Sequence, residues 1–220
     1  MNLRFDVIWD QAPAFAVGLW NTVWICVLGT LLAFVFAIVL VLPLVSRAKF
    51  IRLPVKALVE SARAIPFLML AYLVYYGLPS LGMTLDSWQT AVLVIVIYNA
   101  AYIAEILRSA WVNLPRGQTD AARSYGFTGL KLLRRIILPQ VIIAAAPVLG
   151  NQLIQIIRDS SFLAIITVPE LTFTAKAIQA ESFVPFESFI TAALLYWAVC
   201  LVVEFGVKRL ELARTLYARS

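Results

Sequence analysis

The sequence predicts an all-α membrane protein with about five transmembrane helices, on the basis of its hydrophobicity, its low charge and the length of its apolar runs. Of its 220 residues 62% are hydrophobic and 14% charged, and the mean hydropathy is +0.90. A soluble domain has roughly 25% charged residues. Because the charges gather between apolar runs of about 20 residues, most of the chain is suited to a lipid environment.

The apolar runs place the predicted spans at about 15–45, 57–78, 88–107, 136–157 and 188–207. The first run is longer than a bilayer requires, so either the helix tilts or its start, around Gly18 to Thr22, forms an interfacial turn. In the fourth run Pro147 and Gly150 are residues that can break a helix. No repeat or linker divides the chain, and we expect one transmembrane domain over residues 1–220.

The lysines and arginines predict the orientation, because cytoplasmic loops retain an excess of them. They concentrate in the first and third connections and in the carboxyl-terminal tail, whereas the second and fourth connections carry few. The sequence therefore predicts an external amino terminus and a cytoplasmic carboxyl terminus. The basic residues of the predicted cytoplasmic segments are Arg47, Lys49, Arg52, Lys56, Arg63, Arg108, Arg116, Arg123, Lys131, Arg134, Arg135, Lys208, Arg209, Arg214 and Arg219.

Several other functions are disfavoured by composition. The net charge of +6 forms no basic face on a soluble domain, so nucleic-acid binding is not indicated. The chain has no histidine and no C-x-x-C pair, so a metal centre lacks its usual ligands. Cys26 and Cys200 lie inside apolar runs, as small buried hydrophobes do. The start of the chain lacks a removable signal pattern, so we expect the first apolar run to be retained.

The third connection, residues 109–135, has the composition of a short cytoplasmic helix. Thr119 is a suitable amino-terminal cap, Asp120 suits a first helical turn, and the alanines that follow favour a slim helix. Gly126 suits a left-handed stop. Physical reasoning leaves two uses open: docking into another protein, with Tyr125 and Phe127 as aromatic anchors, or lying on anionic lipid as a basic amphipathic segment.

Asp120-Ala121-Ala122, then Gly126, then Ile137-Leu138-Pro139, resembles the EAA loop of ABC importer permeases. The resemblance extends over most of the chain and is closest to the polar amino-acid uptake branch of that family. It implies that the loop forms a coupling helix docked on an ATPase. Two positions depart from the usual pattern: Asp120 stands where glutamate is usual, and Arg158 where lysine is usual. The implied coupling residues are Gly117, Gln118, Asp120, Ala121, Ala122, Gly126, Leu138 and Pro139.

Further segments carry the likeness to the amino-acid branch. They are Gly18 with Thr22, Arg63-Ala64-Ile65-Pro66, Tyr76-Gly77-Leu78-Pro79, residues 101–108, Gln140 and Arg158-Asp159-Ser160-Ser161-Phe162. Several motifs in order are harder to obtain by chance than one short pattern.

Ionisable residues inside predicted spans are costly in lipid and are therefore candidates for function. Glu105 and Arg108 are three apart and can meet on one helix face, either as a local pair or as part of the substrate pathway. Glu204 lies one turn from Lys208, and we interpret it as an interfacial pair outside the site.

A polar stripe recurs at helical spacing in the fourth run at Gln152, Gln155 and Asp159, next to Arg158. In a straight helix, a rise of about 1.5 Å per residue carries Arg158 to the outer surface, whereas a break at Pro147 or Gly150 leaves it nearer the middle. The stripe serves either a substrate zwitterion or a structural ion pair. The candidate substrate-pathway residues are Glu105, Arg108, Gln152, Gln155, Arg158, Asp159, Ser160 and Ser161.

The chain lacks a G-x-x-x-x-G-K-[ST] phosphate loop, so it needs a separate source of ATP hydrolysis. The resemblance implies a non-catalytic permease subunit of an importer for polar amino acids in a bacterial inner membrane. Its implied partners are a cytoplasmic ABC ATPase dimer that binds ATP and Mg, a second permease subunit, and an extracytoplasmic amino-acid binding protein. The alternatives are an ion-coupled transporter or channel without an ATPase, an intramembrane enzyme, and a non-transporting scaffold.

Overall fold

The computed structural model describes residues 3–217, apart from the side chains of Arg116 and residues 210–217, and this part of the chain is helical with no strand. Arg219 of the predicted basic tail lies outside the described residues. The helices, in chain order, are α1 Phe5–Asp10, α2 Ala12–Leu44, α3 Lys49–Ala64, α4 Phe67–Gly77, η1 Leu78–Leu81, α5 Ser87–Val112, α6 Arg116–Ser124, α7 Gly129–Leu132, η2 Leu133–Ile137, α8 Leu138–Ser160, η3 Ser161–Ile166, α9 Leu171–Ser182 and α10 Pro185–Tyr217.

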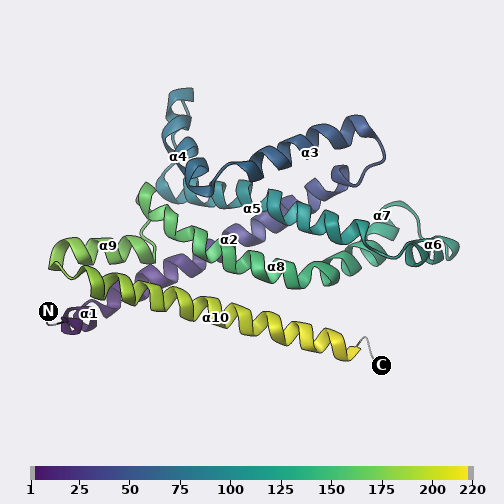
Figure 1. Cartoon of the computed structure of the whole chain (residues 1–220). Coiled ribbons are helices and arrows are strands. Elements are labelled where there is room, and N and C mark those ends of the chain that lie inside the picture. Colours follow the sequence, from purple (N-terminus) through teal and green to yellow (C-terminus); the bar gives the residue numbers. More distant parts are fainter. Residues whose placement is uncertain (1–2, 218–220) are drawn as a thin grey trace.

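The long helices α2, α5, α8 and α10 run side by side, and α3 lies along α2 and α5 (Figure 1). The short helices α6 and α7 lie at one end of this bundle, which we call the α6 end. Helices α1 and α9 lie at the other, the α9 end. The two described ends of the chain lie at opposite ends of the bundle, so the chain crosses it an odd number of times (Figure 1).

Within the described residues, four helical stretches are long and apolar enough to cross a membrane: Ala12–Leu44, Ser87–Val112, Gly129–Ile166 and Pro185–Arg209. The predicted second span over 57–78 is not one straight helix, because α3 and α4 meet at a bend of 99°; together the two helices pass as a broken fifth span or a re-entrant loop. Ile65 has extended backbone angles (φ −83°, ψ 130°) and Pro66 caps α4. Proline disfavours helical geometry in the residue before it, so Pro66 ends α3.

Two expected irregularities are absent. Helix α2 is continuous for 33 residues, so Gly18 and Thr22 do not form an interfacial turn. Helix α8 continues through Pro147 and Gly150, and the expected break there is wrong. Gly150 instead provides space for a close approach of Val207 on α10. The regular helix ends at Ser160, where a 3-10 segment leads to Thr167 in the left-handed region (φ 62°).

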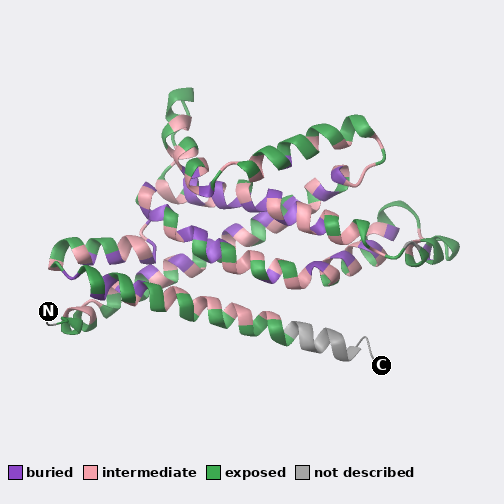
Figure 2. Cartoon of the chain, viewed as in Figure 1, coloured by how far each residue is buried: buried purple, intermediate pink, exposed green. Residues whose placement is uncertain are grey.

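The core is built on small residues between α2 and α5, the helix pair in most extensive contact. Ala33, Ala37, Ala100 and Ala104 are buried there and belong to one apolar cluster. Small side chains let helix backbones approach closely, which is how helices associate in lipid. The outward faces of α3, α4 and α10 are largely exposed (Figure 2) and carry large apolar side chains such as Trp197. These faces are suited to lipid contact.

Candidate functional site

The α6 end presents the segment that sequence analysis singled out. Helix α6 begins at Arg116 with Pro115 as its cap residue and no side-chain cap bond, so the expected cap at Thr119 is wrong. Asp120 is consequently not in the first turn. The helix starts one turn earlier because proline is well suited to a helix entry, and it places Thr119 in the helix interior. The expected left-handed stop is confirmed, since Gly126 has φ +80°.

Asp120 interacts within its own helix. Its carboxylate lies 3.3 Å from the guanidinium of Arg123, and its backbone carbonyl accepts a bond from the Ser124 hydroxyl. Its side chain is 68% exposed, so this ion pair contributes little to stability. The carboxylate therefore remains accessible at the α6 end.

The two alanines of the motif have different surroundings. Ala121 is exposed, whereas Ala122 is buried and packs in the same apolar cluster as the α2–α5 core. Ala122 thus holds α6 against its own chain, and only Ala121 leaves a slim external surface. Gly117 and Gln118 are also exposed.

The remaining part of the loop connects α6 to α8. Tyr125 is 86% exposed, and the Lys131 ammonium lies 5.3 Å from the ring centre of Phe127. Leu138 begins α8 with Pro139 in its first turn, as the sequence predicts. A π-helical turn over Leu133–Ile137 joins it to α7. The motif is therefore continuous with a long helix of the bundle.

The polar stripe on α8 makes two side-chain hydrogen bonds. The Gln152 amide donates to the Asn99 side-chain oxygen on α5 at 2.9 Å. The Gln155 amide donates to the Asp159 carboxylate at 2.8 Å. Asn99 and Asp159 are both buried. A buried carboxylate with one amide partner is costly in a lipid-embedded bundle, and such groups commonly mark a transport pathway.

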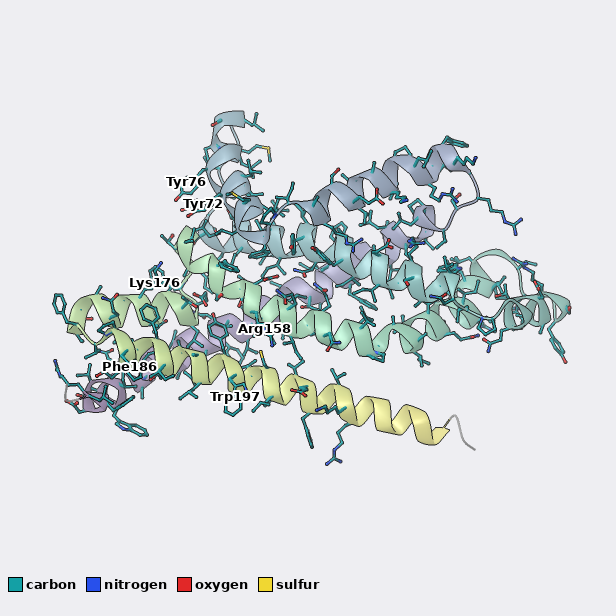
Figure 3. All side chains as sticks on the ribbon, in the orientation of Figure 1. Tyr72, Tyr76, Arg158, Lys176, Phe186 and Trp197 are labelled. Atoms are coloured by element: carbon teal, nitrogen blue, oxygen red, sulfur yellow. The ribbon has the colours of Figure 1, made fainter. Side chains whose placement is uncertain are left out.

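Arg158, unlike the neighbouring Asp159, is not buried. It is exposed and forms no ion pair with Asp159 in the described part of the chain, so of the two alternatives the structural ion pair is not formed. Its side chain lines a cavity of about 490 Å³ between α8 and α10 (Figure 3). Gln155 and Glu204 line the same cavity. Glu204 pairs with Lys208 at 2.6 Å, as the sequence predicts.

The hydroxyls of the two serines after Asp159 donate hydrogen bonds to backbone carbonyls. The Ser160 hydroxyl donates to the Ile157 carbonyl and the Ser161 hydroxyl donates to the Arg158 carbonyl, each at 2.7 Å. Ser160 is buried and Ser161 is half-buried. Both hydroxyls retain acceptor capacity, but their protons are already used at the end of α8.

Glu105 and Arg108 meet on one face of α5, as the spacing predicts. Arg108 donates through Nε and a terminal nitrogen to the two carboxylate oxygens, at 2.8 and 2.7 Å. Both side chains are about a third exposed, and Glu105 lines a second cavity, of about 850 Å³, between α5 and α8. This cavity lies toward the α6 end and reaches Gln152.

The structure adds polar residues that sequence analysis did not select. Asn99 is a polar residue in the otherwise apolar middle of α5, and that isolation is a signal the sequence carries. Glu170 is fully buried at the start of α9, where it accepts bonds from the Thr172 and Phe173 amides and from the Tyr196 hydroxyl. Glu170 lies in a predicted external loop, and only the tertiary contacts show its burial.

Comparisons with known proteins match most of this chain. The family model described as "Binding-protein-dependent transport system inner membrane component" matches residues 27–215. The probable glutamine ABC transporter permease GlnM of Bacillus subtilis (strain 168) is 31% identical over 95% of this chain and 97% of its own. The probable amino-acid ABC transporter permease YckA of the same organism is 35% identical over 92% and 89%.

Solved structures are similar over nearly the whole chain. A crystal structure of an amino acid ABC transporter with histidines has a TM-score of 0.87 and 30% identity, over 96% of this chain and 99% of that one. An inward-facing MetNI methionine ABC transporter has a TM-score of 0.78 at 20% identity, over 93% and 97%, which shows the same fold. The chain therefore belongs to the family of binding-protein-dependent transport system inner membrane components.

Proposed function

We propose that this chain is the permease subunit of an ABC importer that moves polar amino acids across the bacterial inner membrane. Relatives named for glutamine and cystine support the substrate class. The observation that carries a transport role here is Asp159, a buried carboxylate whose one hydrogen-bond partner in the described chain is Gln155. No ion pair among the described residues explains its burial. It is therefore suited to meet the ammonium group of a zwitterion.

The proposed orientation places the α6 end in the cytoplasm and the α9 end outside. The basic residues of the α2–α3 connection and of the loop that carries α6 and α7 gather at the α6 end, which supports this assignment, whereas Arg63 lies at the far end of α3. In this orientation substrate arrives from an extracytoplasmic binding protein at the α9 end and leaves at the α6 end. A second permease subunit, the same chain or a sister, completes the membrane unit.

The proposed coupling site is the exposed surface of α6 and the turn after it. Gly117, Gln118, Asp120 and Ala121 are exposed on that helix, while Ala122, Gly126, Leu138 and Pro139 fix its position relative to α8. A cytoplasmic ABC ATPase dimer would bind ATP and Mg and move this surface. The permease itself is proposed to be non-catalytic.

The proposed substrate pathway includes fewer residues than the set of candidates from the sequence. Asp159, Gln155 and Gln152 form its polar side on α8, and Glu105 with Arg108 lies beside the cavity toward the α6 end. Arg158 lines the cavity facing α10, which Gln155 also lines, and its proposed role is at the margin of the pathway. Ser160 and Ser161 shape the end of α8 and leave lone pairs for a ligand.

Asp159→Asn tests the pathway in the complete transporter reconstituted in proteoliposomes. The substitution keeps the size of the side chain and its ability to accept from Gln155 but removes the charge. We expect amino-acid uptake to fall at least about tenfold, since a charged hydrogen bond contributes roughly 1.5–3 kcal/mol. Glu60→Gln is the control, because Glu60 forms an exposed pair with Lys56. Normal uptake by Asp159→Asn would contradict the pathway.

The rival function is an ion-coupled transporter or channel that needs no ATPase. Uptake by this chain without the ATPase, driven by an ion gradient, would support the rival. We expect no uptake under that condition and full uptake when the ATPase, the binding protein and ATP are restored.

A further inference from the structure

The cavity of about 850 Å³ between α5 and α8 contains an arginine that no part of the proposed pathway uses. Its volume lies within the range of about 300–1,000 Å³ that is typical of small-molecule sites. It extends from Gln152 to the loop at the α6 end. Its polar lining includes Arg63, Tyr102, Glu105, Gln118, Gln140 and Gln152.

Arg63, the second-last residue of α3, brings a guanidinium to this cavity. Its central carbon lies 5.0 Å from the ring centre of Tyr102. The Tyr102 hydroxyl donates to the Arg63 backbone carbonyl at 3.1 Å, which fixes the end of α3 against α5. The position of Arg63 is thus held by its backbone and by ring stacking, and its side-chain N–H groups are left for other partners.

The guanidinium of Arg63 has no protein acceptor among the described residues. Its Nε is buried without a hydrogen-bond partner, and none of the ion pairs in the described chain includes Arg63. A buried donor left unpaired destabilises the folded state, because it has lost its bonds to water without replacement. Such an orphaned group in a cavity indicates a ligand that completes it.

The charge in the cavity is unbalanced toward positive. Glu105 is the carboxylate in the lining, and both of its oxygens already accept from Arg108. The side-chain amides of Gln118 and Gln140 also line the cavity and make no hydrogen bond within the described chain. The cavity therefore offers one guanidinium without a hydrogen-bond acceptor among the described residues, together with neutral amide groups, which suits an anion and a nearby polar group.

We propose that Arg63 binds the α-carboxylate of the transported amino acid at a second station, between the Asp159 cluster and the α6 end. A guanidinium presents paired N–H donors that match the two oxygens of a carboxylate. Gln152, one turn before Gln155 on α8, lines this cavity, so the polar stripe that includes Asp159 leads to it. The inference rests on the proposed function, since it assumes that an amino acid passes Asp159.

The test measures occupancy of this cavity in the complete transporter in lipid nanodiscs. Ser109 is exposed and lines the cavity, so Ser109→Cys supplies a reporter thiol in a Cys200→Ala background, where the remaining Cys26 is buried. A water-soluble methanethiosulfonate modifies the thiol, and its rate is followed against amino-acid concentration. The probe is the amino acid best taken up from a panel of all proteinogenic amino acids and L-cystine.

With Arg63 intact we expect the probe to slow modification of the thiol, and the α-amide of the same amino acid to protect poorly. Arg63→Met keeps the aliphatic stem and the backbone acceptor for Tyr102 but removes the charge. It should shift the protecting concentration at least about tenfold, the effect of one charge-assisted hydrogen bond. Arg63→Lys should restore part of the protection. Arg52→Met, on the same helix and outside the cavity lining, should leave protection unchanged.

Three results would overturn the second station: no protection by the probe when Arg63 is intact, equal protection by the α-amide, or an unshifted midpoint in Arg63→Met. Thermal unfolding checks that Arg63→Met is folded, and Arg63→Lys gives the answer if it is not. Failure of the proposed function is distinguishable, because then no amino acid in the panel would be taken up by the unmodified transporter.

Discussion

At the scale of single residues, Glu170 is a carboxyl group whose pKa is governed mainly by its burial. Burial raises the pKa of the Glu170 carboxyl above its ordinary value, although bonds from Tyr196, Thr172 and Phe173 lower it in part. A raised pKa in the folded state means that folding favours the protonated form. The stability from this group is complete below the ordinary pKa of about 4.3 and is lost as pH rises through the folded pKa.

Glu170→Gln therefore separates this group from the other carboxylates. The substitution keeps an oxygen that can accept from the helix amides of α9 but removes the ionisation. We expect the melting temperature of the unmodified protein to rise, relative to that of the variant, as pH falls from 7 toward 5. Thermal unfolding in detergent at several pH values measures this. A constant difference between the two proteins would contradict a raised pKa at Glu170.

Gly29 is a single residue whose small size allows α2 and α5 to approach closely. A Cβ at Gly29 would lie 2.5 Å from Cγ2 of the buried Ile95 on α5. Gly29→Ala should destabilise the protein by about 1–3 kcal/mol through overpacking. Gly206→Ala is the matched control, because nothing lies within 4 Å of a Cβ there. Thermal unfolding of both variants decides the point, and equal melting temperatures would refute close packing between α2 and α5.

At the scale of elements, α6 has an inner and an outer side that the sequence does not separate. Ala122 packs in the core cluster, while Ala121 faces outward. Ala121→Trp should abolish ATP-driven uptake with little change in melting temperature, because a large side chain blocks docking on the proposed ATPase. Ala122→Trp should lower the melting temperature as well. Uptake at the normal rate in Ala121→Trp would remove this face of α6 from coupling.

Gly126 lies in the turn that follows α6 and tests how that helix is connected to the rest of the chain. With φ +80° it adopts a conformation that costs other residues about 1–2 kcal/mol, although a Cβ there meets nothing within 4 Å. Gly126→Glu should therefore weaken the turn through backbone strain and reduce uptake with the long helices intact. Gly117→Ala, in a helix with the same open surroundings, should be tolerated. Loss of uptake in both variants to the same extent would exclude backbone strain as the cause.

The pair α3–α4 shows where helix prediction from hydropathy fails. Residues 57–78 read as one apolar run, but Pro66 ends α3, and α4 departs at 99°. By contrast, Pro147 and Gly150 do not break α8. A proline that caps a new helix interrupts the chain direction, whereas one inside a packed helix can be accommodated by its neighbours. The residue type was visible in both cases, and only packing distinguished them.

At the scale of the whole molecule, the proposed topology predicts which residues share a membrane face. Single cysteines at Ser124, by α6, and Ser80, after α4, should react with a membrane-impermeant thiol reagent from opposite sides, in a Cys200→Ala background. Ser182→Cys, at the end of α9, should behave as Ser80→Cys does. Modification of all three from one side would contradict an odd number of crossings with the α6 end in the cytoplasm.

The sequence by itself determined the membrane class, the places of four spans, and the motif loop with its glycine stop, because these depend on composition, length and local backbone preference. It also predicted the pairs Glu105–Arg108 and Glu204–Lys208, which need only helical spacing. Tertiary structure alone decided that Asp159 is buried whereas Arg158 is exposed beside a cavity facing α10, that Ala122 is internal, and that the Nε of Arg63 is buried without a hydrogen-bond partner among the described residues. Those facts depend on which neighbouring helix faces each side chain, and helical periodicity does not specify the neighbour.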